Sequence, residues 1–469
     1  MGRAEIRRFQ KAADGVASSL KQKLSSGARV KVISHTDADG ISAAAILVQY
    51  FHKHNIPFDT TFTRPLEPSE VAELAKGDYD LFVFIDQGTG QLSAIRKYLL
   101  ETGHDVVILD HHSGEYFHHP NLTLLNPHAY GLNGAKDVSA SGVVYSVVER
   151  MDESFRPMAW QALVGALGDR EEFFSGFTGI NEVLLRQAIN LGTMEVGEGL
   201  RLVGRDLFPV AECLRFSVRP YLKGLTGSPE ACRELVETLG IPPEGTLDQL
   251  GREREMTLRD VLLARSGKVA NDMFRHVLWG PLYIPKVRWV RGPQDLHGYI
   301  AMLDACDKLR RPDVSFAAFL GDESAAKNAL AILRRYQEQM ADILHWFDIN
   351  RDKFETSPQM RYIYAGKRIK PNMIGEAISL AMESSLVETD RPVIGLVDSG
   401  NELKVSARAT PRYAMEGGVL GETIRRVALD LGGSGGGHDT AAAARVPLKR
   451  KDEFISKLDQ ALAGVKIGN

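Results

Sequence analysis

Cysteine is scarce in this sequence of 469 residues, and its three copies are far apart. Cys213, Cys232 and Cys306 form no CxxC pair, which argues against a disulfide framework and against a zinc ribbon. Long apolar runs are lacking too, since none approaches the ~20 residues of a membrane span. The charged N-terminal segment contains no apolar signal-peptide core. These absences predict a cytoplasmic protein that does not enter a membrane.

An excess of positive charge is also missing, because the net charge is −3. No overall field would draw the chain onto nucleic acid, so such a contact would need a local patch or a metal site. The sequence has no GxxxxGKS/T phosphate loop, which argues against ATP hydrolysis. The composition, 44% hydrophobic and 25% charged, is that of an ordinary globular protein.

Short apolar segments alternate with helical patterns in the first part of the chain. The segments predicted as strands are ARVKVIS, FDTTFT, DLFVFID, DVVILD and LTLLN. This alternation indicates an α/β fold with a parallel sheet covered on both faces. Three of these strands lead into His35, Asp86 and Asp110. Because ligands bind at the carboxyl ends of strands in such sheets, we expect these side chains to converge.

Three regions follow from the changing pattern along the chain. Residues 1–192 carry the parallel-sheet pattern, and residues 193–357 form an inserted or middle segment that is mostly helical. Residues 358–469 return to a smaller α/β pattern, with the strand candidates RYIYAG, PVIGLVDS and ELKVSARA. The length fits such a division, since domains of ~100–200 residues are usual.

The segment SHTDADG at 34–40 holds three potential metal ligands at alternate positions. His35, Asp37 and Asp39 follow a strand, and alternate residues of an extended segment point to one side. Imidazole combined with carboxylates suits a cation such as Mn²⁺. The alternative for this motif alone is a helix N-cap followed by a solvated acidic loop.

Further candidates stand behind two other apolar strands and a helix. Asp86 follows LFVFI, and Asp110, His111 and His112 follow VVIL. Asp169 closes the apolar helix ALVGALG, where a carboxylate opposes the helix dipole and a bound cation would compensate. A hydrogen-bonded loop pair is the alternative for the two histidines.

The order HxDxDG, lone Asp, DHH and GD resembles the DHH phosphoesterase family. The resemblance implies one Mn²⁺ held by His35, Asp37 and Asp86, with Asp86 shared by the second ion. The second ion would be held by Asp39, Asp86, His111 and Asp169, and Mg²⁺ could replace Mn²⁺. His112 would face the scissile phosphate, while Asp110 would orient His111. Two such cations make water a nucleophile in hydrolysis of a phosphate ester.

The glycine-rich segment GGSGGGHDTAAAA at 432–444 resembles the signature of the DHH-associated C-terminal domain. Gly435, Gly436 and Gly437 would let backbone N–H groups approach a phosphate, and His438 could donate to it. The resemblance adds Arg408 in VSARAT as a substrate-binding residue. An alanine stands where the family usually has its last glycine. A flexible loop is the alternative for this segment, and Arg412 is a weaker substrate candidate.

The middle segments resemble archaeal RecJ-like proteins, a group that includes the GINS-associated nuclease. The stretches concerned are FSVRPYLKGLTGSPEACRELVETLGI and DLHGYIAMLDACDKLRRPDVSFAAFLGD. The resemblance implies an exonuclease acting on single-stranded DNA or RNA in replication or repair. One alternative is a replication-fork scaffold that binds GINS and the replicative helicase. Another is an oligoribonuclease or a cyclic-dinucleotide phosphodiesterase.

Overall fold

The computed structural model describes residues 2–25, 27–172, 176–266, 271–286 and 292–463. Contacts divide the chain into two units, the first made of Met1–Leu207 and Gly280–Arg334 and the second of Phe208–Trp279 and Arg335–Asn469. The segment 193–357 therefore contributes to both units.

The first unit is built on a five-stranded parallel sheet with the order β2-β1-β3-β4-β5. Its strands are β1 (Val30–His35), β2 (Phe58–Thr63), β3 (Leu81–Ile85), β4 (Asp105–Leu109) and β5 (Leu122–Leu125). The central strand β3 is buried along its whole length, as its uninterrupted apolar sequence LFVFI requires. The five predicted strands and the α/β class are confirmed.

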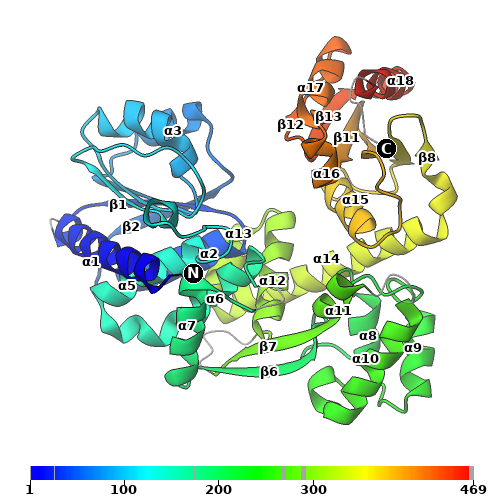
Figure 1. Ribbon diagram of the computed structural model, residues 1–469, viewed down its shortest axis with the longest axis horizontal. Helices are drawn as coiled ribbons and strands as arrows, with labels where there is room; N and C mark the ends of the chain where they lie inside the picture. Colours follow the sequence, from blue (N-terminus) through cyan, green and yellow to red (C-terminus); the bar gives the residue numbers. More distant parts are fainter. Residues whose placement is uncertain (1, 26, 173–175, 267–270, 287–291, 464–469) are drawn as a thin grey trace. The chain divides into compact units, whose positions relative to one another are not determined.

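Helices cover both faces of this sheet. On one face, α3 (Pro68–Leu74) and α4 (Leu92–Ile95) enclose a core that includes Phe82, Phe84 and Ile108. On the other face lie α2 (Ala38–Lys53) and α5 (Ala140–Met151), which also pack on each other. Figure 1 shows α3 on one side of the sheet and α5 on the other.

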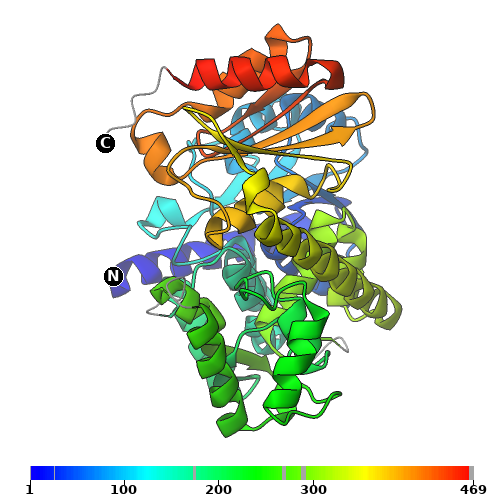
Figure 2. The same cartoon turned by 90° about the vertical axis from the view of Figure 1, so that its right-hand side faces the viewer.

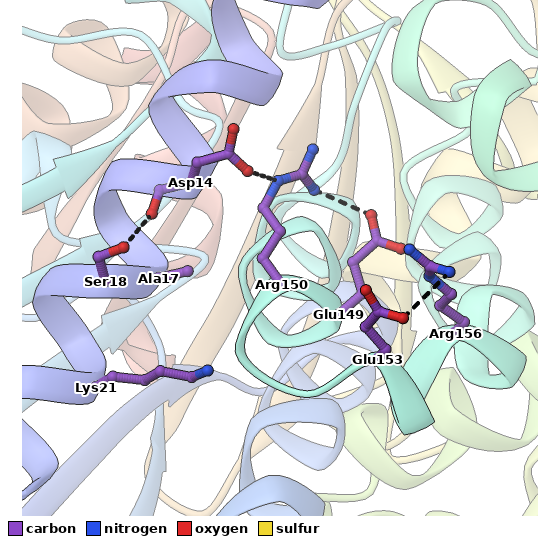
Figure 3. A pocket seen from close by; sticks show the side chains of 8 residues that line it. All are labelled: Asp14, Ala17, Ser18, Lys21, Glu149, Arg150, Glu153 and Arg156. Atoms are coloured by element: carbon purple, nitrogen blue, oxygen red, sulfur yellow. Dashed lines mark hydrogen bonds and ion pairs between the residues drawn. The ribbon is translucent and has the colours of Figure 1, made fainter.

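The N-terminal helix α1 (Arg3–Ser25) packs along α5 and β5. A shallow hollow beside it is lined by charged side chains of both helices (Figure 3). Arg150 joins the helices there, because its guanidinium contacts Asp14 at 2.6 Å and Glu149 at 3.0 Å. Arg156 lies 3.5 Å from Glu153 in the same hollow. The Arg150–Asp14 ion pair thus ties α1 to α5 at this hollow.

The remaining helices of the first unit support α2 and α5. α6 (Ala159–Gly168) packs on both, and α7 (Gly179–Asn190) packs on α6. β6 (Met194–Leu200) pairs with β7 (Trp279–Pro285). α12 (Leu296–Lys308) and α13 (Pro312–Phe319) contact α6 and α2. The long α14 (Glu323–Ile349) begins in the first unit and ends in the second.

The second unit contains a six-stranded sheet with the order β12-β13-β11-β10-β9-β8. The pair β9–β10 is parallel and the other neighbours are antiparallel. The strands are β8 (Glu355–Thr356), β9 (Arg361–Gly366), β10 (Val393–Ser399), β11 (Glu402–Arg408), β12 (Ser434–Gly437) and β13 (Ala441–Pro447). This C-terminal sheet confirms the predicted second α/β region.

The helices of this sheet lie on its two faces. α17 (Leu420–Asp430) and α18 (Lys451–Leu462) share one apolar core with β11 and β13, whereas α15 (Ile374–Glu383) contacts β10 and β11 from the other side. In Figure 2 the red α18 and the gold α15 lie on opposite sides of the strands. The unit also contains the helices α8 (Val210–Arg215), α9 (Pro229–Thr238), α10 (Arg252–Ser266), α11 (Asp272–Leu278) and α16 (Pro411–Met415). None of the helices in the described residues combines the length and apolar character of a membrane crossing.

Candidate metal centre

The predicted ligands of the first unit lie together at the carboxyl edge of its sheet. His35 ends β1, Asp86 directly follows β3, and Asp110 directly follows β4. The neighbouring strands β1, β3 and β4 are parallel, so their carboxyl ends meet at one edge. Asp169 reaches the same place from the end of α6.

Three groups of these side chains place potential ligand atoms within 4.8 Å of one another. One group is His35, Asp37 and Asp86; the second is Asp39, His111 and Asp169; the third is Asp86, His111 and His112. Asp86 links the groups: its Oδ2 is 3.5 Å from His35 Nδ1, and its Oδ1 is 3.2 Å from His111 Nε2. His111 Nε2 is also 3.3 Å from Asp169 Oδ2.

Asp86 is held in an uncommon backbone conformation for a residue with a side chain. Its φ is 56°, in the left-handed region, and the residue is buried. Within the described part of the chain, Asp86 Oδ1 and His111 Nε2 are buried atoms without a hydrogen bond. Such groups are expensive to bury unless something coordinates them. The imidazole and carboxylate donors around them fit a divalent cation such as Mn²⁺.

Asp39 is fixed by the first turn of α5. Its Oδ2 accepts a hydrogen bond from the N–H of Ala140 at 2.6 Å, and its Oδ1 accepts one from Ser141 at 2.8 Å. The positive end of the helix dipole thus supports this fully buried carboxylate. α6 passes so close that a Cβ added to Gly165 would lie 1.9 Å from Asp39 Oδ1.

The two histidines behind β4 are held by different partners. The His111 ring is held through Nδ1, which donates to the carbonyl of Gly134 at 2.6 Å. Asp110 Oδ1 instead accepts from the main-chain N–H of His111 at 2.8 Å and lies 2.8 Å from His112 Nδ1. We expected Asp110 to orient the His111 ring, but its ring contact is with His112. The His111 ring is held by Gly134 instead, so Asp110 reaches His111 only through its main-chain N–H.

The crowded carboxylates perturb the proton affinities in the cluster. Burial, followed by the neighbouring charge of Asp86, raises the pKa of Asp39 to about 7. Burial and the charge of Asp39 likewise raise the pKa of Asp169 well above its ordinary value. Burial opposes the charged form of His35, but hydrogen bonds to Asp37 and Asp86 raise its pKa to about 10. Without a cation the cluster therefore retains protons, which a metal would displace.

Two residues of the site were missed by the sequence analysis. Gly134 receives the His111 ring so closely that an added Cβ would lie 1.8 Å from the His111 carbonyl oxygen. Glu171 is buried, and its Oε1 lies 3.6 Å from His111 Nδ1. Its other oxygen accepts a hydrogen bond from Asn181. The only sequence signal for Glu171 is its position two residues after Asp169.

The other predicted site residues belong to the second unit. Arg408 ends β11, and its Nε donates to Ser379 Oγ at 2.9 Å. Gly435, Gly436 and Gly437 form most of β12, so this run is an edge strand. A Cβ on Gly435 would lie 3.2 Å from the Ala428 side chain, whereas one on Gly436 would meet open space. His438 is exposed in the turn that leads to β13.

Sequence comparison finds two families in the chain. The DHH family, N-terminal domain, matches residues 29–167. The DHHA1 domain matches residues 359–464. The uncharacterized protein MJ0831 of Methanocaldococcus jannaschii is 27% identical over 454 residues, which cover 95% of this chain and 96% of that protein.

Solved structures with low sequence identity share the fold. RecJ of Thermus thermophilus, in complex with Mn²⁺, matches with a TM-score of 0.54 at 16% identity. The match covers 97% of this chain, which spans 55% of the Thermus chain. CDC45 of Entamoeba histolytica matches with a TM-score of 0.70 at 12% identity, over 97% of this chain and 99% of that one. The fold is therefore RecJ-like, with both units represented in the match.

Proposed function

We propose that this chain, whose residues 29–167 match the DHH family, N-terminal domain, and whose residues 359–464 match the DHHA1 domain, is a metal-dependent nuclease that hydrolyses single-stranded DNA or RNA from an end. The observation that carries the proposal is the buried pair Asp86 Oδ1 and His111 Nε2, which lie 3.2 Å apart and have no further hydrogen bond within the described residues. A pair of divalent cations would satisfy these atoms. The RecJ of Thermus thermophilus was crystallised with Mn²⁺, which supports that choice of ion.

The proposed ligands divide between two ions that share Asp86. The first ion would be held by His35, Asp37 and Asp86, and the second by Asp39, Asp86, His111 and Asp169. When bound, two such cations activate water and neutralise charge on the reacting phosphoryl group. Mg²⁺ would suit the carboxylates but keeps more of its own water, so we expect Mn²⁺ to be preferred.

The side chain of His112 is placed to act on the substrate. It is 58% exposed, whereas that of His111 is only 7% exposed. Asp110 fixes its Nδ1, so its Nε2 remains available to a ligand. We assign it a hydrogen bond to the scissile phosphate. In the second unit, Arg408, His438 and the open side of Gly436 would bind the sugar–phosphate backbone.

The test is digestion of end-labelled single-stranded DNA and RNA by the full chain. Protein stripped with a chelator should be inactive, and Mn²⁺ should restore stepwise release of nucleotides from one end. A dinucleotide and a cyclic dinucleotide, tested in parallel, would reveal an enzyme for small substrates instead. The absence of cleavage of every strand by metal-loaded protein would refute the proposal.

The likeness to CDC45 favours a second candidate, a scaffold in DNA replication that binds GINS and the replicative helicase. The two roles are compatible, because every proposed ligand position is occupied by a His or Asp. Pull-down with purified GINS from the same organism at physiological salt is the direct test. Failure to bind would remove the scaffold role and leave the nuclease role untouched.

A further inference from the structure

The face of the C-terminal sheet opposite α17 and α18 carries three cations in neighbouring positions. Leu403, Val405 and Ala407 of β11 point into the core shared with those helices. The alternating residues therefore lie on the other face, and they include Lys404 and Arg408. The register places Arg445 of β13 directly opposite Lys404, so it shares that face.

Lys404 is the member of this group without a counterion. It is half-buried and forms no ion pair among the described residues. Arg445 reaches Glu402 at 3.1 Å, and Arg408 is attracted by Glu376. Burial, followed by the charges of Arg445 and Arg408, lowers the pKa of Lys404. A desolvated ammonium beside two guanidinium groups destabilises the free protein unless an anion neutralises it.

Small residues form the surface beside these cations. Ala441 and Ala443 of β13 pair with Arg408 and Ser406, and both are partly exposed. Gly436 pairs with Ala443, and a Cβ added to it would meet nothing within 4 Å. Helix α15 covers this face over β10 and the end of β11 that holds Ser406 and Arg408, so the sterically open part lies over β13 and β12. An extended chain could approach the cations from that side.

We propose that Lys404 and Arg445 form a second phosphate subsite, which holds a further phosphodiester of the substrate strand beside the one expected at Arg408 and His438. Lys404 and Arg408 lie four residues apart on β11, about 13 Å along the strand, so they are spaced to hold different phosphates of one strand. The inference rests on the proposed function, and it makes the substrate class a strand of several nucleotides rather than a dinucleotide.

The first readout is the stability of the variant Lys404→Met. Removing the charge while keeping an apolar side chain of similar length should raise the melting temperature of the free protein, because the unfavourable burial of the ammonium is relieved. A structural lysine would give the opposite sign. Lys449→Met is the matched control, since Lys449 is an exposed cation beyond the end of β13 and its loss should leave the melting temperature unchanged.

The second readout is binding of a single-stranded oligonucleotide of about 12 nucleotides by the full chain, measured with the metals chelated. Lys404→Met should bind about tenfold more weakly, the equivalent of one charged hydrogen bond. The slope of log K against log salt should fall by about 0.7, the value for one lost phosphate contact to a single strand. Arg445→Gln should weaken binding in the same direction, and Lys449→Met should not.

Cleavage separates this inference from the proposed function. With Mn²⁺ restored, Lys404→Met should keep the wild-type rate on a dinucleotide and lose efficiency on the long strand. Wild-type protein that binds the strand and never cleaves it would refute the nuclease while leaving the subsite in place. Unchanged strand binding in Lys404→Met, an equal loss in Lys449→Met, or a lower melting temperature would overturn the subsite. Failure of wild-type protein to bind any strand would overturn both.

Discussion

The carboxyl edge of the first sheet crowds carboxylates around His111, whereas the face of the C-terminal sheet opposite α17 and α18 brings cations together. In both regions, neighbouring groups of like charge disfavour the charged state of one residue. Burial and Asp86 raise the pKa of Asp39 to about 7, and burial and Arg445 lower the pKa of Lys404. In each region, charge of one sign is in excess. The first region would bind cations and the second would bind anions. This division is expected of a metal-dependent enzyme that acts on phosphodiesters.

Rigidity differs between the two regions as well. Asp39 is fully buried and held by two main-chain N–H groups of α5, and Asp86 is only 3% exposed. Arg408 and Lys404 lie half-buried on a strand, and His438 is exposed. Chemistry at a metal requires fixed ligands, while a strand that advances between cleavages requires contacts that can be released. We therefore expect substitutions in the first region to affect turnover and those in the second to affect binding.

The largest effect should come from Asp86→Ala. Because Asp86 is the ligand shared by both proposed ions, the variant should lose bound Mn²⁺ and turnover should fall below detection. Metal content and single-strand cleavage are measured on the same preparation, beside chelated wild-type protein whose activity Mn²⁺ restores. Cleavage by Asp86→Ala at near the wild-type rate would show that the assigned centre is wrong.

A smaller loss of turnover should follow from His112→Ala. His112 is assigned to the phosphate, so both Mn²⁺ ions should remain bound while cleavage slows by about a hundredfold, as for loss of a positioned proton donor. Asp110→Asn should slow cleavage in the same direction, because Asp110 holds the His112 ring. If His112→Ala instead lost an equivalent of metal, His112 would be a metal ligand. The assignment of His111 to the metal and His112 to the phosphate would then be wrong.

In the second region, Arg408→Ala should raise KM by about tenfold to a hundredfold, with kcat and metal content nearly unchanged. The loss is of binding shared by the ground and transition states, since Arg408 lies in the C-terminal sheet. Arg425→Ala is the control: Arg425 is exposed on α17, which packs on the opposite face of the sheet, and pairs with Glu422 at 2.8 Å. His438→Ala should resemble Arg408→Ala. Unchanged kinetics in both Arg408→Ala and His438→Ala would show that the C-terminal sheet does not contribute to substrate binding.

The parts of the fold and of the site that could be predicted from the sequence are those whose pattern lies within one short segment of the chain. The strands were found because β3 and its neighbours are short apolar runs between helices, and the parallel order then placed His35 and Asp86 at one edge. The domain boundaries and the roles of the site residues remain predictions. The long α14 joins both units, and no local pattern reveals to which unit each neighbouring segment contributes.

Contacts that depend on tertiary structure could not be predicted. The carbonyl of Gly134 reaches His111 across 23 positions of the chain, through a loop with no motif of its own. Lys404 and Arg445 meet only because of the register between β11 and β13, which the sequence does not show. Asp110 could be placed next to both histidines, but which ring it would contact depends on the path of the turn after β4.

The smallest expected effect concerns Glu171, which we treat as a positioning residue of the first region. Its buried carboxylate lies 3.6 Å from His111 Nδ1, where a negative charge makes the imidazole a stronger ligand. Glu171→Gln should therefore weaken Mn²⁺ binding by about tenfold, with little change in KM for the strand.

The matched control is Glu172→Gln, which removes a neighbouring charge that pairs with Arg201 at 3.0 Å instead. That control should lower the melting temperature, because it removes the carboxylate charge that faces the buried guanidinium of Arg201, and it should keep the wild-type Mn²⁺ affinity. Equal Mn²⁺ affinities in wild type and Glu171→Gln would assign Glu171 to packing alone, and rescue by Glu171→Asp would support its charge as the cause.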